Sequence, residues 1–364
     1  MRYYIVAGEH SGDMHGADLI IQLKKLDPAA DFWACGGTAM EKAMGKPCCL
    51  YTTIVASMGL DFIEHIYKLW QWLTFCKQGL LRYQPDLLIL IDFGSFNMRL
   101  ASFAKQHGFP VYSYIPPKIW AYRKPRITRI QKNIKQIFSV LPFEVASYQA
   151  YGYNAIEYVG NPLVQKVARH VVNANFAAAH GLDKRPIIAL LPGSRIDEVK
   201  RILPIMASQA AYFSSYQLVV AGLTHLPSLL YKAIPSSIRM VYDQTYDLLA
   251  IAQAAIVASG TATLETALWN VPQIVVYKVS CLTYCLYKRI LSVPYISLVN
   301  LLLNRTAVPE LIQDVLTEQQ LYATLTELLI ERVSTKQKAY YQELKQLLGS
   351  KEASVEIAQF LLQI

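Results

Sequence analysis

Short apolar runs alternate with amphipathic segments along the whole chain. The most apolar run covers residues 87–91, and a continuous run of this length is typical of a parallel strand buried on both faces. Further strands are predicted at residues 3–7, 111–115, 137–141, 187–191, 217–221, 255–258 and 274–277, and another apolar run ends at Cys35. Helical patterns lie between these runs. The alternation predicts an α/β protein whose two halves are each doubly wound around a parallel sheet.

A chain of 364 residues is longer than one hydrophobic core usually organises, so two domains are expected. The apolar periodicity weakens between residues 161 and 184, which marks the boundary. We predict an N-terminal domain at 1–165 and a C-terminal domain at 166–345. The remaining residues, 346–364, are predicted to form a helix that returns to the N-terminal domain.

The composition excludes a disordered chain, because 53% of the residues are hydrophobic and 17% are charged. A mean hydropathy of +0.23 indicates large cores or an apolar surface that meets lipid. The least charged stretch, residues 251–277, is interrupted by Gly260 and Pro272 and so does not predict a spanning helix. The N-terminus enters a glycine-rich loop too early for a signal peptide, and a cytoplasmic protein is predicted.

Positive charge is concentrated in one region of a chain whose net charge is +9. No acidic residue lies between Asp92 and Glu144, where the basic residues are Arg99, Lys105, Lys118, Arg123, Lys124, Arg126, Arg129, Lys132 and Lys135. Such a field favours an anionic partner, which would be nucleic acid, a phosphorylated substrate or an anionic membrane. A solvated basic face is the alternative.

Two loops that follow predicted strands have the composition of phosphate-binding turns. In the first, Ser259, Gly260 and Thr261 open a helix, whose free N–H groups and positive end suit a pyrophosphate. The two hydroxyls are expected to cap that helix. Glu265 lies one turn further and would accept hydrogen bonds from a ribose. Ordinary capping beside a solvated glutamate is the alternative.

The second loop contains Gly193, Ser194 and Arg195. A guanidinium at this place can neutralise a leaving diphosphate without a metal ion, whereas a surface ion pair with Asp197 or Glu198 is the alternative. Neither loop has the G-x-G-x-x-G or G-x-x-x-x-G-K-S/T spacing, which disfavours a dehydrogenase or a P-loop NTPase. The cysteines and histidines show no metal-ligand spacing, so neither a metal nor a cofactor is predicted.

Two further polar residues are candidates for chemistry. Asp92 ends the run 87–91, and a carboxyl group at a strand end can face a ligand site where poor solvation raises its pKa towards that of a general base. A turn or cap role is the alternative. Asn300 could donate a hydrogen bond to a sugar or phosphate, with an ordinary turn residue as the alternative.

The segment 61–75 is apolar on more than one helical face. Phe62, Ile66, Leu69 and Leu73 form one stripe, and Ile63, Trp70 and Phe75 lie outside it. A helix buried on all sides would explain this pattern. We favour an acyl-chain groove or an interfacial helix with tryptophan at the level of lipid headgroups.

The order and spacing of nine motifs between Tyr4 and Gln313 resemble the lipid-A-disaccharide synthase family. The motifs lie at residues 7–13, 58–59, 91–97, 117–121, 141–144, 160–162, 191–195, 259–265 and 297–302. Ser95, Lys118 and Gln165 depart from common family patterns, but none of them replaces a matched catalytic residue.

The resemblance implies a GT-B fold, with two Rossmann-like domains facing a central cleft, and an inverting sugar transfer that releases UDP. The donor would be UDP-2,3-diacylglucosamine and the acceptor 2,3-diacylglucosamine 1-phosphate (lipid X), joined by the β-1,6 bond of the lipid A disaccharide. The family's catalytic Asp, Arg and Asn correspond to Asp92, Arg195 and Asn300.

Besides the catalytic residues, the expected site has a donor-binding part, which includes Arg195 again, and an acceptor and lipid part. The donor-binding residues are Gly193, Ser194, Arg195, Ser259, Gly260, Thr261 and Glu265. The acceptor and lipid residues are Ser11, Gly12, Trp70, Trp120 and Arg123. The predicted partners are the two lipid substrates and the anionic inner-membrane surface, with no nucleic acid, for a monomer or homodimer.

Two other functions are compatible with these residues. A UDP-N-acetylglucosamine 2-epimerase would share the UDP loops but would not need the apolar segment 61–75. A non-enzymatic binder of membrane or nucleic acid would explain the charge but would leave the two loops and Asp92 unexplained.

Overall fold

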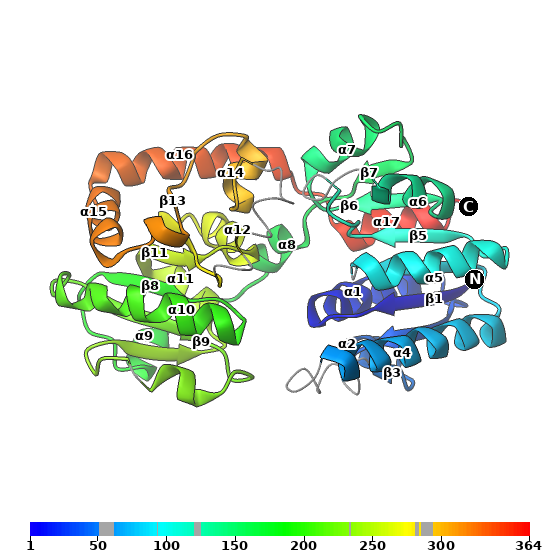
Figure 1. Cartoon of the computed structure of the whole chain (residues 1–364), viewed down its shortest axis with the longest axis horizontal. Helices are drawn as coiled ribbons and strands as arrows, with labels where there is room; N and C mark the ends of the chain where they lie inside the picture. The colour runs from blue at the N-terminus through cyan, green and yellow to red at the C-terminus, as the bar shows by residue number, and fades with distance from the viewer. Residues whose placement is uncertain (51–61, 93, 120–124, 233, 281–283, 285–293) are drawn as a thin grey trace. The chain divides into compact units, whose positions relative to one another are not determined.

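The computed structural model describes residues 1–50, 62–92, 94–119, 125–232, 234–280, 284 and 294–364. The chain divides into two units (Figure 1). Unit 1 contains Met1–Pro162 and Ser350–Ile364, and unit 2 contains Leu163–Gly349. Each unit is an α/β layer structure around its own parallel sheet.

The sheet of unit 1 has seven parallel strands in the order β3-β2-β1-β4-β5-β6-β7. The strands are β1 (Arg2–Ala7), β2 (Asp31–Gly36), β3 (Cys49–Leu50), β4 (Leu87–Ile91), β5 (Val111–Tyr114), β6 (Gln136–Ser139) and β7 (Ile156–Tyr158). The helices are α1 (His10–Leu26), α2 (Thr38–Met44), α4 (Phe62–Tyr83), α5 (Gly94–Gln106), α6 (Pro125–Asn133), α7 (Pro142–Gln149) and α17 (Ala353–Leu361).

Two apolar clusters, one on each face of this sheet, hold unit 1 together. One joins the strands to α1, α2 and α17, and the other joins them to α4, α5, α6 and α7. The C-terminal helix α17 packs along α1, with Ile357 and Leu361 fully buried and the ring of Phe360 5.2 Å from that of Phe138. The predicted return of the final helix to the N-terminal domain is confirmed (Figure 1).

The sheet of unit 2 repeats this plan with the parallel order β10-β9-β8-β11-β12-β13. Its strands are β8 (Ile187–Leu191), β9 (Gln217–Gly222), β10 (Arg239–Tyr242), β11 (Ala252–Ala258), β12 (Gln273–Tyr277) and β13 (Glu310–Ile312). Its helices are α8 (Pro162–Ala168), α9 (Phe176–Ala179), α10 (Ile196–Ala207), η1 (Ser208–Ala211), η2 (Ser228–Tyr231), α11 (Thr245–Ile251), α12 (Thr261–Leu268), α14 (Leu298–Leu303), η3 (Gln313–Val315), α15 (Glu318–Leu328) and α16 (Glu331–Leu348).

The strand order places a switch point in each sheet. The chain winds outward in one direction from β1 and in the other from β4, and it does the same from β8 and β11. Ala7 pairs with Ile91 at the carboxyl ends of β1 and β4, and Leu191 pairs with Val257 at those of β8 and β11. Ligands of open α/β sheets bind at such points, so a ligand site is expected at the loops after these four strands.

No helix in the described part of the chain is long and apolar enough to cross a membrane.

Candidate functional site

The loop after β8 forms one side of the switch point in unit 2. Gly193 has a φ of 108°, a left-handed value that favours glycine. A Cβ at Gly193 would lie 2.6 Å from a carboxylate oxygen of Glu198 and 3.1 Å from its Cβ. The turn therefore needs glycine for both its conformation and its packing, and it delivers Ser194 and Arg195 to the start of α10.

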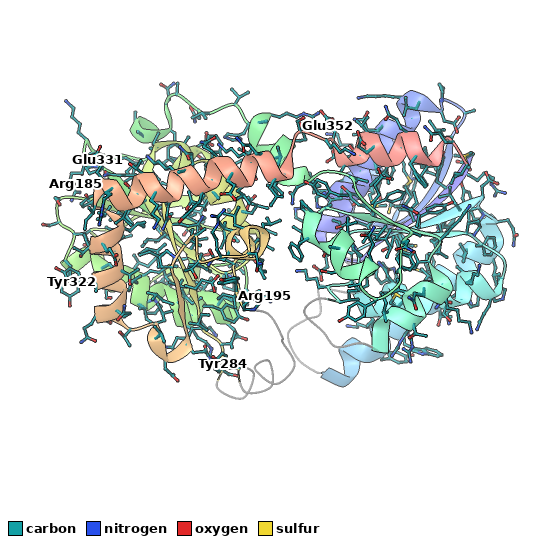
Figure 2. The ribbon with its side chains drawn as sticks, turned by 90° about the horizontal axis from the view of Figure 1, so that it is seen from above. Arg185, Arg195, Tyr284, Tyr322, Glu331 and Glu352 are labelled. Atoms are coloured by element: carbon teal, nitrogen blue, oxygen red, sulfur yellow. The ribbon has the colours of Figure 1, made fainter. Side chains whose placement is uncertain are left out.

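Arg195 is the N-cap residue of α10, and its side chain is 80% exposed. Its guanidinium lies 3.6 Å from the carboxylate of Glu198, one turn into the helix. The surface ion pair weighed as an alternative is thus present, and its exposure leaves the guanidinium accessible to a ligand (Figure 2). Exposed pairs of this kind are weak enough to exchange for a diphosphate.

The loop after β11 forms the other side of the switch point in unit 2. The N-cap of α12 is Gly260, which offers no side chain, so the prediction that Ser259 and Thr261 cap this helix is wrong. Ser259 instead donates its hydroxyl to the carbonyl of Ile296 at 2.8 Å, and Thr261 is the first helical residue. A Cβ at Gly260 would meet nothing within 4 Å, so the space in front of the helix start is open.

Glu265 lies one turn into α12, as the sequence spacing predicts. Its carboxylate accepts a hydrogen bond from the hydroxyl of Tyr246 and lies 4.0 Å from the ammonium of Lys166. Burial, followed by the negative charge of Glu265, raises the pKa of Tyr246, so the phenol keeps its proton and donates a hydrogen bond to the carboxylate. Tyr246 and Lys166 were not predicted, because they meet Glu265 only in the folded chain.

Asn300 is fully buried in α14, and its amide is saturated by the protein. The amide nitrogen donates to the carbonyl of Val308 at 2.9 Å and to the carboxylate of Glu310 at 2.8 Å. The amide oxygen accepts from the N–H groups of Ala307 at 2.8 Å and Val308 at 2.9 Å. An amide has two donors and two acceptor sites, so the group is directed at protein atoms and away from the sugar or phosphate expected from the sequence.

The partner of Asn300 connects this network to the loop after β11. Glu310 accepts hydrogen bonds from the N–H groups of Ile296 and Ser297, both at 3.0 Å, in addition to the one from Asn300. The carbonyl of the same Ile296 accepts the hydroxyl of Ser259. Asn300 and Glu310 thus hold the backbone against which Ser259 rests, which makes Asn300 a positioning residue.

We expect Asn300→Ala to lower the free energy of unfolding by about 3 kcal/mol, because it leaves several buried donors and acceptors unpaired. Urea unfolding measures this change, and Gln320→Ala, which removes an exposed amide from the same unit, should leave stability within about 0.5 kcal/mol of the parent. A contact role would instead give normal stability with reduced turnover, and that result would contradict the positioning role.

The corresponding loops of unit 1 show backbone strain at the carboxyl ends of neighbouring strands. Asp92 directly follows β4 with a φ of 48°, and Ile115 directly follows β5 with a φ of 61°. A left-handed conformation is uncommon for aspartate and costly for a β-branched residue. Asp92 is fixed there by its N–H, which donates to the carbonyl of Tyr114 at 3.0 Å, and by Asn97, whose amide nitrogen donates to the Asp92 carbonyl. Such strain marks candidate functional positions.

The loop after β1 leads into the first turn of α1, which contains Ser11 and Gly12. A Cβ at Gly12 would lie 3.2 Å from the Cβ of Ala7 and 3.6 Å from the carbonyl oxygen of Ile91, so glycine lets α1 pack closely on the sheet. Ser11 is exposed at the helix start. Asp13 is buried, and its carboxylate accepts from the N–H groups of Gly37, Ala39 and Met40, which fixes the start of α2.

Helix α4 exposes a partly apolar face. Tyr67 and Trp70 are 61% and 62% exposed, and Phe75 is also exposed, while Trp72 on the other side is buried and stacks on Phe96 with ring centroids 4.6 Å apart. A helix buried on all sides is therefore excluded for residues 67–83. The predicted lipid residues Trp120 and Arg123 lie outside the described residues.

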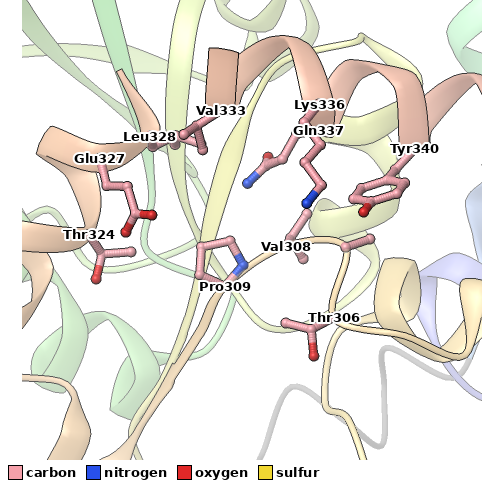
Figure 3. Close-up of a pocket in the computed structure, with 11 residues that line it drawn as sticks. Thr306, Val308, Pro309, Thr324, Glu327, Leu328, Val333, Lys336, Gln337 and Tyr340 are labelled. Carbon is pink, nitrogen blue, oxygen red and sulfur yellow. The ribbon is translucent and has the colours of Figure 1, made fainter. Parts of the chain in front are cut away.

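A pocket of about 210 Å³ lies elsewhere in unit 2, between the segment 306–309 and the helices α15 and α16 (Figure 3). It contains none of the predicted site residues. Its wall includes Ala307 and Val308, whose N–H groups donate hydrogen bonds to the amide oxygen of Asn300. The pocket is therefore separate from the switch-point loops.

Solved structures with the same fold include enzymes of nucleotide-sugar chemistry. A UDP-GlcNAc 2-epimerase from Neisseria meningitidis, solved with UDP-GlcNAc bound, superposes with a TM-score of 0.70 at 12% identity over 100% of both chains. The glycotransferase of kitacinnamycin superposes with a TM-score of 0.66 at 12% identity over 100% of this chain and 98% of that one. At such low identity these likenesses show the fold alone, and the predicted GT-B class is confirmed.

Sequence comparison is far more specific. The chain is 37% identical over 356 residues to a lipid-A-disaccharide synthase of Syntrophus aciditrophicus, covering 94% of this chain and 91% of that protein. It is 34% identical over 374 residues to the synthase of Geobacter metallireducens, covering 100% of this chain and 97% of that one. A sequence model of the lipid-A-disaccharide synthetase family matches residues 3–364. The chain therefore belongs to the lipid-A-disaccharide synthase family, whose members are glycosyltransferases of lipid A biosynthesis.

Proposed function

We propose that the protein transfers 2,3-diacylglucosamine from its UDP derivative to the 6-hydroxyl of 2,3-diacylglucosamine 1-phosphate. The observation that carries this proposal is the pair of loops at the switch point of unit 2. One presents the exposed guanidinium of Arg195, and the other presents the open start of α12 with Glu265 one turn behind it. A cation, free N–H groups and a carboxylate match the diphosphate and ribose of a sugar nucleotide.

In the proposed donor site, the N–H groups at the start of α12 and the guanidinium of Arg195 bind the diphosphate. Glu265, held by Tyr246, accepts the ribose hydroxyls. Negative charge grows on the diphosphate as its bond to C1 of the sugar breaks. Arg195 stabilises that charge, so its contribution is larger in the transition state than in the bound substrate.

In the proposed transfer, the carboxylate of Asp92 accepts the proton of the acceptor 6-hydroxyl. The hydroxyl oxygen forms a bond to C1 on the face opposite the diphosphate, and UDP leaves with the electron pair of the broken bond. The configuration at C1 is inverted, and the product is a β-1,6 disaccharide 1-phosphate. The fixed left-handed backbone of Asp92 at the end of β4 supports this assignment.

The reaction is tested by incubating the purified protein with both proposed substrates and analysing the lipids by mass spectrometry. A disaccharide 1-phosphate that accumulates with free UDP supports the proposal. A folded protein that binds UDP but forms no disaccharide would contradict it, and conversion of UDP-N-acetylglucosamine to its 2-epimer would support the alternative activity.

We also propose that unit 1 binds the anionic surface of the inner membrane, where the lipid substrates reside. The exposed ring side chains of α4 suit the headgroup region. Exposed basic residues supply the electrostatic attraction, and those with described side chains in this region are Arg99, Lys105, Lys118, Arg129, Lys132 and Lys135.

We expect the triple replacement of Tyr67, Trp70 and Phe75 by serine to weaken binding to phosphatidylglycerol vesicles by at least about tenfold, since each ring contributes apolar area. Vesicle co-sedimentation measures this change. Replacing Tyr212 and Tyr322, two exposed rings of unit 2, by serine is the matched control and should change little.

Neutralising the basic residues Arg123, Lys124, Arg126 and Arg129 together should weaken the same binding and reduce its dependence on salt. Vesicle binding that survives both sets of replacements would contradict the membrane proposal.

A further inference from the structure

A second pocket of unit 2 has no part in the machinery described above. It encloses about 450 Å³ between α10 and the segment that follows β9. Its lining residues are Ile196, Val199, Lys200, Leu203, Pro204, Ala207, Pro227, Leu229, Leu230 and Ile234. All but Lys200 are apolar, and the volume lies within the range of small-molecule sites. We call this pocket the α10 groove.

The walls of the α10 groove include apolar side chains that the protein itself does not cover. Leu229 on η2 is 70% exposed, and Ile196 at the start of α10 is exposed as well. Val199 and Leu203 form a buried floor that continues into the core of unit 2. The groove is therefore an apolar surface in contact with water, and an apolar ligand would remove that contact.

The α10 groove begins where the diphosphate loop ends. Ile196 lines the groove and directly follows Arg195, whose guanidinium is the exposed cation of that loop. Helix α10 has 12 residues and is about 18 Å long, and groove residues occur along it from Ile196 to Ala207. An anion-binding loop and a long apolar groove thus lie end to end on one helix.

The charges around the groove fit an amphiphile with an anionic head. Lys200 is the charged lining residue, one turn after Ile196. The acidic residues of the first turn are Asp197 and Glu198, and Glu198 is engaged by Arg195. Lys200 can attract the polar oxygens of such an amphiphile, and the apolar side chains of Leu203 and Ala207 line the groove beyond it.

We propose that the α10 groove binds one fatty acyl chain of the sugar-nucleotide donor while the donor's diphosphate rests on the Arg195 loop. This inference rests on the proposed function, since it assigns part of the same substrate. The groove would distinguish an acylated donor from an ordinary sugar nucleotide, because the unacylated molecule leaves Leu229 and Ile196 in water.

The test compares the affinities of UDP and UDP-2,3-diacylglucosamine by calorimetry for the parent and for Leu229→Glu. The exposed side chain of Leu229 makes this variant compatible with folding. We expect the parent to bind the acylated donor more tightly than UDP. Leu229→Glu should weaken the acylated donor about tenfold and leave UDP unchanged. The control is Ile251→Glu, a 41% exposed position before the amino end of β11, which should behave as the parent.

Ala207→Leu provides a second test of the proposal for the α10 groove. It narrows the end of the groove far from Arg195, so it should slow transfer from a long-chain donor while transfer from a butanoyl donor stays near the parent rate. Equal loss with both donors, or none with either, would overturn the assignment.

Three outcomes keep the proposals apart. If the parent forms the disaccharide and Leu229→Glu binds the acylated donor as tightly as the parent does, the acyl-chain proposal for the α10 groove is overturned but the proposed function is not. A folded parent that neither binds UDP nor forms disaccharide overturns the proposed function. In a third outcome, Leu229→Glu binds phosphatidylglycerol vesicles less well than the parent in the absence of donor, but its affinity for the acylated donor is unchanged. The groove would then contact the bilayer, and the proposal that it binds an acyl chain would be overturned.

Discussion

Replacing Arg195 by alanine is expected to lower the turnover number by about 10²–10³-fold. This is the usual effect of removing one preorganised group that stabilises the charge developing in the transition state. The fold should survive, because the side chain is 80% exposed and its ion pair with Glu198 is a surface contact that contributes about 1 kcal/mol or less. Disaccharide formation under saturating substrates measures the effect, with circular dichroism as the check on folding.

The matched control is Arg201→Ala, which removes another exposed arginine of helix α10. Its turnover should stay within about twofold of that of the parent. Arg195→Lys keeps the charge but loses the planar, bidentate fork, so its turnover should lie between those of the parent and the alanine variant. Near-normal turnover of Arg195→Ala would remove this residue from the mechanism.

The central strands could be predicted closely from the sequence, because both of their faces are buried. The structure gives β4 and β8 the predicted bounds Leu87–Ile91 and Ile187–Leu191. The edge strands β3, β7, β10 and β13 were not predicted. They are short and have at least one side in contact with water, as in β10, where Arg239 and Tyr242 are exposed. A run of this kind has neither the continuous nor the alternating pattern of a strand.

The positions of the loops could be predicted from the sequence, but the hydrogen bonds of their side chains could not. Placing Ser259 and Arg195 after strands required only local patterns. That Ser259 donates to Ile296 depends on a residue 37 positions away in the sequence. The saturation of Asn300 likewise depends on the return of the chain at Ala307 to Glu310, and no local signal separates a saturated amide from an available one. The two loops of unit 2 could therefore be predicted to follow strands, whereas the contacts of their side chains could not be predicted.

The second large effect is expected for Asp92→Asn. The change removes the proposed proton acceptor while keeping the size and the polar character of the side chain, so kcat should fall by about 10²–10⁴-fold. Asparagine tolerates the left-handed backbone as well as aspartate does, so we expect the variant to fold like the parent. Disaccharide formation by the purified variant under saturating substrates measures this loss, with circular dichroism as the check on folding.

The chain provides a close control for this experiment in Asp243→Asn. Asp243 also directly follows a strand, β10, with a left-handed φ of 55°, and its carboxylate binds Thr224 of the neighbouring loop. Asp243 has no part in the proposed transfer, so the same substitution in the same backbone conformation should leave turnover close to that of the parent. If both variants lose activity to the same extent, the loss reflects the strained turn, and Asp92 is then not the base. If only Asp92→Asn loses activity, a carboxylate at the end of β4 accepts the proton, and the strained backbone at that strand end holds the base in place.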